Sequence, residues 1–205
     1  MVAASGGRLP AEQAIETLWP EADPAAGRNR LRTVLVRLKE AAAGAVQRDG
    51  ELLTLGAGIR VDLAQFHAET RQALALRPGN PGAAVALARS AIARYRGDLL
   101  PDDPYEAWAD EPREAARRAM LEVLDLCATA AAERGELDEA RRMVERSLEI
   151  APFEEDRYLR VARILRDQGR TGAALSVLRR ARAVLAPLGI EVPLRLPGSG
   201  KTAAA

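Results

Sequence analysis

Polar and basic side chains that could bind a polyanion are concentrated in one short stretch near the start of the chain. Residues 28–39 include five basic residues and no acidic residue. Arginine and asparagine carry planar donor and acceptor groups that match the edges of guanine and adenine, and arginine also pairs with phosphate. The candidate DNA contacts are Asn29, Thr33 and Arg37 for base edges, and Arg30, Arg32 and Arg48 for phosphates.

Most of these candidates are predicted to lie on one amphipathic helix that covers about residues 24–43. Pro20 ends the preceding segment, and Asp23 can cap a new helix. Pro24 fits the first helical position, where its missing N–H has no partner to lose. The apolar stripe of this helix consists of Leu31, Val34, Leu35 and Leu38. The sequence therefore predicts a helix that packs by one face and presents a basic one.

A charged face opposite an apolar stripe is also typical of a helix that only meets solvent. Solvated faces usually mix signs, because opposite charges one turn apart attract one another, and this face has no acid. The helix by itself leaves DNA and solvent about equally favoured. Gross charge does not decide between them: the chain has a net charge of +1, and residues 1–60 hold eight basic and seven acidic groups.

The first 60 residues are predicted to fold as helix, turn, basic helix and hairpin. Pro10 is expected to open a short helix. Its inward residues are Ala14, Ile15 and Leu18. Two apolar runs, 45–48 and 52–55, flank Asp49-Gly50, a pair typical of a tight hairpin turn that requires positive φ angles. This order is that of the C-terminal two-thirds of a winged helix-turn-helix, with the hairpin as the wing.

From Val61 the sequence predicts one helix after another. Asp62 is expected to cap a helix. The inner face of that helix is predicted to hold Leu63, Phe66, Thr70 and Leu74. A second helix is expected to reach about residue 96. A proline-rich link over residues 97–108 then precedes a long helix over about residues 111–134.

A repeat occupies the last part of the chain. Residues of the same kind recur 34 positions apart. The matched pairs are Gly135 and Gly169, Ala140 and Ala174, and Val144 and Leu178. Thirty-four residues is the tetratricopeptide period, and small residues suit the places where paired helices approach closely. Such arrays mostly bind peptides or other proteins, so this part is predicted to be an interaction domain.

The composition favours a soluble helical protein. Hydrophobic residues make up 48% of the 205 residues but aromatic residues only 3%, so the core has to be built from alanine, leucine and valine. No apolar run reaches the roughly 20 residues that a membrane helix needs, and the start of the chain lacks the apolar stretch of a signal peptide. We expect a cytoplasmic protein that does not contact a membrane.

Residues for catalysis or metal binding are sparse. His67 is the single histidine and has no ligand at metal-binding spacing, so it is predicted to be a packing or surface residue. Cys127 stands alone in an apolar run, which indicates a buried thiol and excludes an internal disulfide. Gly200-Lys201-Thr202 imitates the end of a phosphate-binding loop, but the glycine required five residues earlier is Arg195. We predict no enzyme, no cofactor and no metal, and a flexible tail over residues 191–205.

The chain resembles the SARP-type bacterial transcriptional regulators, in which a bacterial transcriptional activator domain (BTAD) follows an OmpR-type winged helix. The resemblance extends from residue 6 to about residue 192. The matching segments are 12–20, 23–24, 27–31, 37–39, 48–50, 61–66, 95–100, 105–108 and 175–182.

The resemblance implies a DNA-binding transcriptional regulator of mainly α fold. Residues 1–60 would be an incomplete winged helix-turn-helix, whose helix 24–43 reads the major groove of double-stranded DNA while the wing touches the backbone. Residues 61–190 would be a tetratricopeptide-like domain that supports homodimerisation or contact with RNA polymerase or another regulatory protein.

Only residues 1–4 could remain of the first helix of a complete OmpR-type domain. We therefore expect a truncated or split regulator that binds DNA weakly by itself. The alternative is a protein-interaction module of a larger regulator, with no DNA binding of its own.

Overall fold

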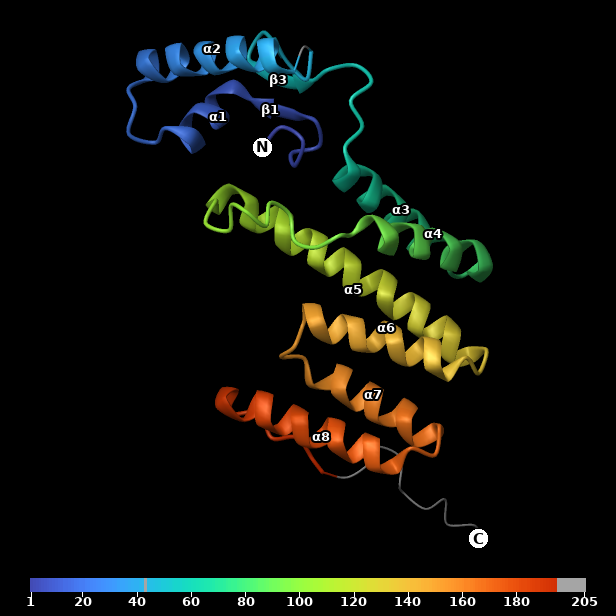
Figure 1. Cartoon of the computed structure of the whole chain (residues 1–205). Helices are drawn as coiled ribbons and strands as arrows, with labels where there is room; N and C mark the ends of the chain where they lie inside the picture. The colour runs from blue at the N-terminus through green and yellow to red at the C-terminus, as the bar shows by residue number, and fades with distance from the viewer. Residues whose placement is uncertain (43, 195–205) are drawn as a thin grey trace. The chain divides into compact units, whose positions relative to one another are not determined.

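The computed structural model describes residues 1–42 and 44–194, and these are mainly helical (Figure 1). The first elements are β1 (Arg8–Pro10), α1 (Ala11–Leu18), α2 (Pro24–Ala41), β2 (Val46–Asp49) and β3 (Leu52–Leu55). The helices that follow are α3 (Asp62–Leu76), α4 (Pro81–Arg94), α5 (Asp110–Glu133), α6 (Leu137–Ile150), α7 (Glu155–Asp167) and α8 (Thr171–Leu185). Two 3-10 helices, η1 (Ala107–Ala109) and η2 (Ala186–Leu188), precede α5 and follow α8. A small sheet followed by a helical array confirms the predicted fold class.

Contacts within the chain group its residues into two compact units. The first unit holds residues 1–68 and 94–116, and the second holds residues 69–93 and those from 117 onward. Helices α3 and α5, and α4 by its last residue, therefore supply residues to both units. The division into 1–60, 61–190 and 191–205 stays a prediction about domains.

A three-stranded antiparallel sheet supports α1 and α2. The strand order is β1-β3-β2, with Leu9 of β1 opposite Leu53 of β3. Leu9 and Leu53 are buried with Ala11, Ala14 and Leu31 in one small core. Strand β1 was not predicted from the sequence, because a three-residue strand that ends in proline has too little alternation to detect.

The hairpin turn lies one residue later than the sequence predicts. Asp49 pairs with Leu52, so the loop consists of Gly50 and Glu51 and not of Asp49 and Gly50. Gly50 has a φ of 59°, and Glu51 has a negative φ. Positive φ at the first loop position alone is the type II′ pattern, which requires glycine there and accepts an ordinary residue second.

Two residues assigned to the inner faces of α1 and α2 are exposed. Leu18 is 42% exposed and Val34 is 41% exposed, whereas Leu31 is 2% exposed. Gly27 is also buried, and the contact between the helices centres on Gly27 and Leu31. Val34 lies about 60° from Leu31 around the helix, at the edge of the stripe, so a contact this narrow leaves it uncovered.

The predicted repeat is present as a repeated structure in α5–α6 and α7–α8. Gly135 and Gly169 follow the first helix of each pair with φ of 75° and 74°. After each glycine, the next backbone N–H reaches back into the preceding helix, from Glu136 to Ala131 O and from Arg170 to Leu165 O, at 2.9 and 2.8 Å. This is the hydrogen bond of a Schellman ending, which needs a residue with positive φ.

The matched residues of the repeat are all buried in one core. Ala140, Ala174 and Leu178 are 0% exposed and Val144 is 1% exposed. Alanine at the first pair of positions lets the backbones of neighbouring helices approach, while the aliphatic pair fills the seam. Successive helices α6, α7 and α8 pack side by side (Figure 1).

The single histidine and the single cysteine are both packing residues. The His67 ring lies against Phe66, with ring centroids 5.2 Å apart, and Phe66 itself is 3% exposed. Cys127 is buried and unpaired, and burial raises the pKa of its thiol. A raised thiol pKa lowers the thiolate fraction, so Cys127 is chemically quiet at neutral pH.

One arginine organises the irregular link between α4 and α5. The Arg113 side chain on α5 is 9% exposed. Its guanidinium donates to the backbone carbonyls of Leu99, Pro104, Glu106 and Asp103 and to the Asp110 carboxylate. Because residues 99–106 of the link form no helix or strand, this side chain binds carbonyls that a regular element would otherwise pair.

The start of the predicted tail belongs to the helical core. Val192 is 3% exposed and packs with Leu185 and Ala181 of α8 in the core of the array. The predicted tail therefore begins with one packed residue, and its flexibility stays a prediction. Residues 195–205, which include Gly200-Lys201-Thr202, lie outside the described part of the chain.

Candidate nucleic-acid interface

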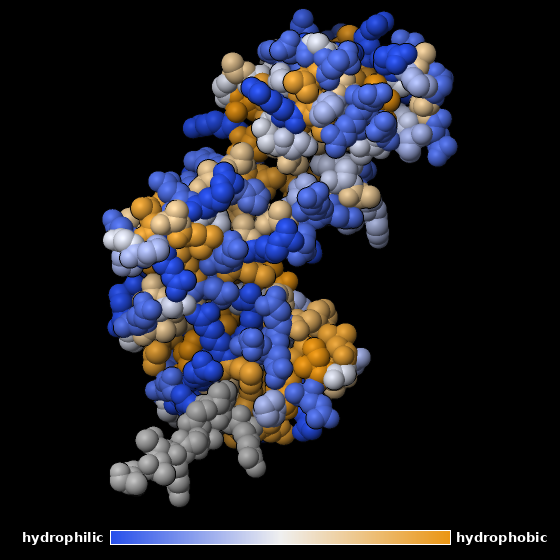
Figure 2. Space-filling view, turned by 180° about the vertical axis from the view of Figure 1, so that it is seen from behind, coloured by the Kyte–Doolittle hydropathy of each residue, from blue (hydrophilic) through white to orange (hydrophobic). Residues whose placement is uncertain are grey.

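All six residues predicted to contact DNA are exposed. Five lie on α2 and Arg48 lies on β2. The six are Asn29, Arg30, Arg32, Thr33, Arg37 and Arg48. In Figure 2 the part of the chain that contains α1, α2 and the sheet shows mostly hydrophilic side chains, with smaller apolar areas between them.

Asp23 fixes the start of α2. Its Oδ1 atom accepts hydrogen bonds from the backbone N–H groups of Ala25 and Ala26 at 2.9 and 3.0 Å, and Pro24 is the first helical residue. These two hydrogen bonds, from Ala26 and Ala25, lower the pKa of Asp23. The capped end determines where the helix begins, and with it the directions in which its basic residues point.

Asn29, Thr33 and Arg37 form a row along α2, since they are four residues apart. The Thr33 hydroxyl donates to the backbone carbonyl of Asn29 at 3.0 Å. That bond holds the hydroxyl in place and leaves the Asn29 amide and the Arg37 guanidinium exposed. The row presents donors and acceptors of the kind that read base edges.

A groove of about 470 Å³ runs between α2 and β2. It is lined by Arg32, Leu35, Val36, Lys39, Gly44, Val46, Gln47 and Arg48. Three of these residues are cationic and none is acidic. The groove therefore has a lining that is partly apolar and positively charged, which suits a chain of phosphates better than a neutral ligand.

The basic residues of α2 form no ion pairs with described acids, although the Asp23 carboxylate lies within electrostatic range of Arg28 and Arg30. Arg28, Arg30, Arg32, Arg37 and Lys39 make no ion pair within residues 1–42 and 44–194. Arginine and lysine on a solvated helix commonly pair with acids one turn away, as Arg141 and Glu145 do on α6. The contrast between α2 and α6 favours an external anion as the partner of α2.

Arg48 is held by its own turn. Its Nε donates to the Gly50 carbonyl at 2.9 Å, and a terminal nitrogen lies 3.7 Å from the Glu51 carboxylate. The Glu51 side chain is 89% exposed, and ion pairs of this kind contribute little. The guanidinium therefore lines the groove with only a weak, exposed ion pair for a phosphate to displace.

The structure brings together Arg32 and Arg48 in one groove. Two more residues line it, Lys39 and Gln47, which were not among the predicted DNA contacts. Lys39 was detectable, because it lies seven residues after Arg32 and so on the same side of the helix. Gln47 was not, because the neighbour of a strand residue depends on the fold. Arg30 and Arg37 are not in the groove and lie toward the other flank of α2.

Other kinds of site have no support in the described residues. No group of three or more histidine, cysteine, aspartate or glutamate side chains lies close enough to hold a metal ion. No described helix has the length and apolar character to cross a bilayer.

In sequence order, the described chain has a small sheet with two helices and then a repeated helical array. The family model of the bacterial transcriptional activator domain matches residues 61–196. The chain belongs to this family, which is regulatory and not enzymatic. A search of curated proteins finds no match to the chain.

Proposed function

We propose that the chain is a DNA-binding transcriptional regulator in which residues 1–60 act as a winged helix-turn-helix. Helix α1, the turn at Pro20 and helix α2 form the helix-turn-helix, and β2 and β3 form the wing. The observation that carries the proposal is the groove beside α2, which has cations from helix and wing and no carboxylate. Membership in a transcriptional activator family supports it.

In this proposal α2 enters the major groove of double-stranded DNA. Asn29, Thr33 and Arg37 face base edges, where planar amide and guanidinium groups form paired hydrogen bonds. The backbone of one strand lies along the groove between helix and wing. Its phosphates contact Arg32, Lys39 and Arg48, while Arg30 contacts phosphates on the other flank.

The helical array would then couple this contact to other proteins. We propose that residues 61–190 form the tetratricopeptide-like domain and support a homodimer or a contact with RNA polymerase or another regulatory protein. Stacked helix pairs present a continuous surface to a partner, which supports this assignment.

The first test measures binding of the full chain to a pool of short labelled duplexes by fluorescence anisotropy at two salt concentrations. The double variant Arg32→Ala with Lys39→Ala removes two cations of the groove. Arg180→Ala with Arg182→Ala removes two exposed cations of α8 and serves as the matched control. We expect the groove variant to lose affinity and about two units of salt slope, and the control to bind as the unmodified chain does.

The competing function is a protein-interaction module that does not bind DNA. Its support is that the family model matches residues 61–196 and does not extend over α1, α2 and the sheet. No binding of the duplex pool at low salt, or equal losses in both double variants, would favour this competing function.

A further inference from the structure

A pocket of about 350 Å³ lies where the start of α3, the link after α4 and the first part of α5 meet. All of its lining residues belong to the first compact unit. Most of them are apolar, namely Leu63, Phe66, Leu99, Leu100, Pro101 and Ala116. Sites for small organic molecules are typically concave, mostly apolar and roughly 300–1,000 Å³ in volume, and this pocket falls within that range.

Two aromatic rings give the pocket a surface on which a planar group can pack. The centroids of the Phe66 and Tyr95 rings are 5.7 Å apart, and the rings are inclined by 48°. The Tyr95 hydroxyl donates to the Asp98 carboxylate at 3.1 Å, so the polar end of this ring already has a partner. The ring faces remain as apolar lining, and offset or tilted aromatic contacts are favourable.

The backbone of the link holds one wall of the pocket in a fixed shape. Leu100 has a φ of 53° and is the one non-glycine residue with positive φ in residues 1–42 and 44–194. Its carbonyl accepts from the Asp103 N–H at 3.1 Å, and the Leu99 carbonyl accepts from Arg113 at 2.9 Å. Rare backbone conformations persist where the surroundings hold them, and they are frequent at ligand-binding sites. The pocket is therefore formed before a ligand enters.

Four charged residues line the pocket, and three of them have partners in the described part of the chain. The Asp62 carboxylate accepts from the next backbone N–H at 2.8 Å, and Asp98 accepts the hydroxyl named above. Arg94 also has an interaction within the chain. Arg96 is exposed and makes no hydrogen bond or ion pair with any described residue.

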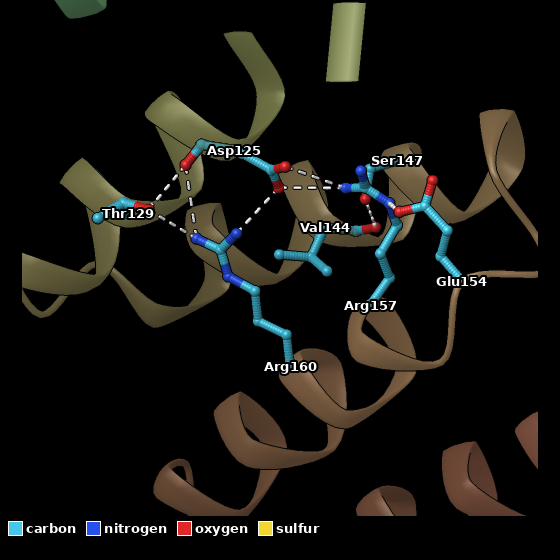
Figure 3. A network of polar contacts seen from close by, with 7 residues as sticks. All are labelled: Asp125, Thr129, Val144, Ser147, Glu154, Arg157 and Arg160. Atoms are coloured by element: carbon cyan, nitrogen blue, oxygen red, sulfur yellow. Dashed lines mark hydrogen bonds and ion pairs between the residues drawn. The ribbon is translucent and has the colours of Figure 1, made fainter. Parts of the chain in front are cut away.

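Arginines of the helical array show what a paired guanidinium looks like in this protein. Arg157 and Arg160 of α7 both point toward Asp125 of α5, with hydrogen bonds of 3.1 and 2.9 Å (Figure 3). Arg157 also donates to Glu154 at 2.7 Å. These guanidiniums hold α5 and α7 together. Arg96 lines a pocket instead, and no described acid pairs with it, which favours an external anion as its partner.

We propose that this pocket binds a small organic acid, a molecule with an apolar or aromatic body and one carboxylate. The body packs on the rings of Phe66 and Tyr95 and on the leucines of the link. The carboxylate accepts charge-assisted hydrogen bonds from the Arg96 guanidinium, whose planar fork matches its two oxygens. The site uses none of the residues proposed to contact DNA.

One negative charge fits the pocket better than several charges or a cation. The carboxylates of Asp62 and Asp98 line the same space, so a phosphate or a second carboxylate would lie near them and be repelled. A cation is disfavoured because both carboxylates already accept hydrogen bonds and two guanidiniums, those of Arg94 and Arg96, line the pocket.

The test measures the binding of 2-naphthoate, an aromatic acid, to the full chain by ligand-observed NMR. 2-Naphthamide has a similar shape without the charge and is the neutral probe. Arg96→Gln removes the cation of the site, and Arg180→Gln on α8 is the matched control, since each lowers the net charge from +1 to 0. Leu100→Asn makes the wall polar, while asparagine tolerates the positive φ.

We expect the unmodified chain and Arg180→Gln to bind 2-naphthoate alike, and Arg96→Gln to bind it at least about threefold more weakly. The neutral probe should bind more weakly than the acid and with equal affinity to the unmodified chain and to Arg96→Gln. Leu100→Asn should weaken both probes, because both depend on the apolar wall.

No saturable binding of 2-naphthoate, or equal affinities of the unmodified chain and Arg96→Gln, would overturn the proposal. Equal weakening in Arg96→Gln and Arg180→Gln would do so too, because attraction would then follow net charge alone. Neutral probe that binds as tightly as the acid would refute the ligand class, and unchanged affinities in Leu100→Asn would show that the probes bind elsewhere. Each of these failures leaves the proposed DNA contact of α2 untouched, since that contact uses residues 1–60.

Discussion

Gly27 of α2 lies so close to Ile15 of α1 that a β-carbon at position 27 would come within 2.4 Å of Ile15 Cγ2. The close approach depends on the absence of a side chain and sets the distance between the two helices. We expect Gly27→Ala to destabilise the chain by about 1–3 kcal/mol of packing strain, offset by up to about 1 kcal/mol of gained helix propensity. Thermal unfolding measures the net loss.

Gly172 on α8 is the matched control for that substitution, because a β-carbon there meets no atom within 4 Å. Gly172→Ala should leave the unfolding temperature unchanged or raise it. Adding Ile15→Ala to Gly27→Ala should recover part of the lost stability. Equal effects at positions 27 and 172 would show that α1 and α2 do not depend on this close approach.

Base contacts and phosphate contacts of α2 can be distinguished by how DNA binding depends on salt concentration. Asn29→Ala should reduce the preference for a selected duplex over an unrelated one, because it removes a base contact. Arg30→Ala should weaken binding to all duplexes alike and reduce the salt slope by about one unit. Anisotropy titrations at several salt concentrations distinguish these outcomes, and equal, salt-independent losses would contradict the assignment.

The helical array should tolerate an aspartate at Leu188 and not at Leu178. Leu178 is 0% exposed in the core of the repeat, so Leu178→Asp should cost about 3 kcal/mol or more and abolish cooperative folding of the array. Leu188 is 55% exposed, and Leu188→Asp should leave the melting curve nearly unchanged. A soluble, cooperatively melting Leu178→Asp protein would show that the packed seam lies elsewhere.

Arg113 should control the order of the link over residues 97–109. Arg113→Ala leaves several backbone carbonyls of the link without their hydrogen-bond donor. We expect it to lower the free energy of unfolding by about 2–4 kcal/mol. Hydrogen exchange should rise in the link, and the fluorescence of Trp108 should shift, since the Trp108 indole donates to Glu106 within it. Arg118, an exposed residue of α5 with no partner among the described residues, provides the control variant Arg118→Ala.

The cap of α2 should make its stability depend on acid. The pKa of Asp23 is lowered in the folded chain, so its contribution is fully present above the ordinary carboxyl pKa of 3.8. The contribution is lost as the pH falls through the lower, folded value. Asp23→Ala should be less stable than the unmodified chain at neutral pH, and the difference should shrink in acid, as followed by circular dichroism.

The features of this fold that depend on a few neighbouring residues could be predicted from the sequence. The cap at Asp23, the start of α1 after Pro10 and the buried residues of the repeat are all as expected, because each rests on spacing or on a single backbone requirement. The exposure of Val34 was not predictable in this way, since a helical wheel shows a stripe but not how much of it a neighbour covers.

The same distinction between local patterns and tertiary packing applies to the candidate site. Exposure of the basic residues of α2 followed from the helical period. The sequence could not predict that Arg32 and Arg48 line the same groove, or that Gln47 lines it too. Both facts depend on where β2 packs beside α2. The bond of Arg48 to its own turn depends on the hairpin register, which the structure places one residue away from the predicted turn.

The glycine endings after α5 and α7 divide the array into repeated helix pairs. Each ending is closed by hydrogen bonds within its own few residues. The helix endings therefore do not depend on one another, whereas the packing of each pair depends on its neighbour, as in a one-dimensional lattice. On heating, such a lattice is expected to fray from a free end and not to melt everywhere at once. Length would then be a quantity that selection can adjust in increments of 34 residues.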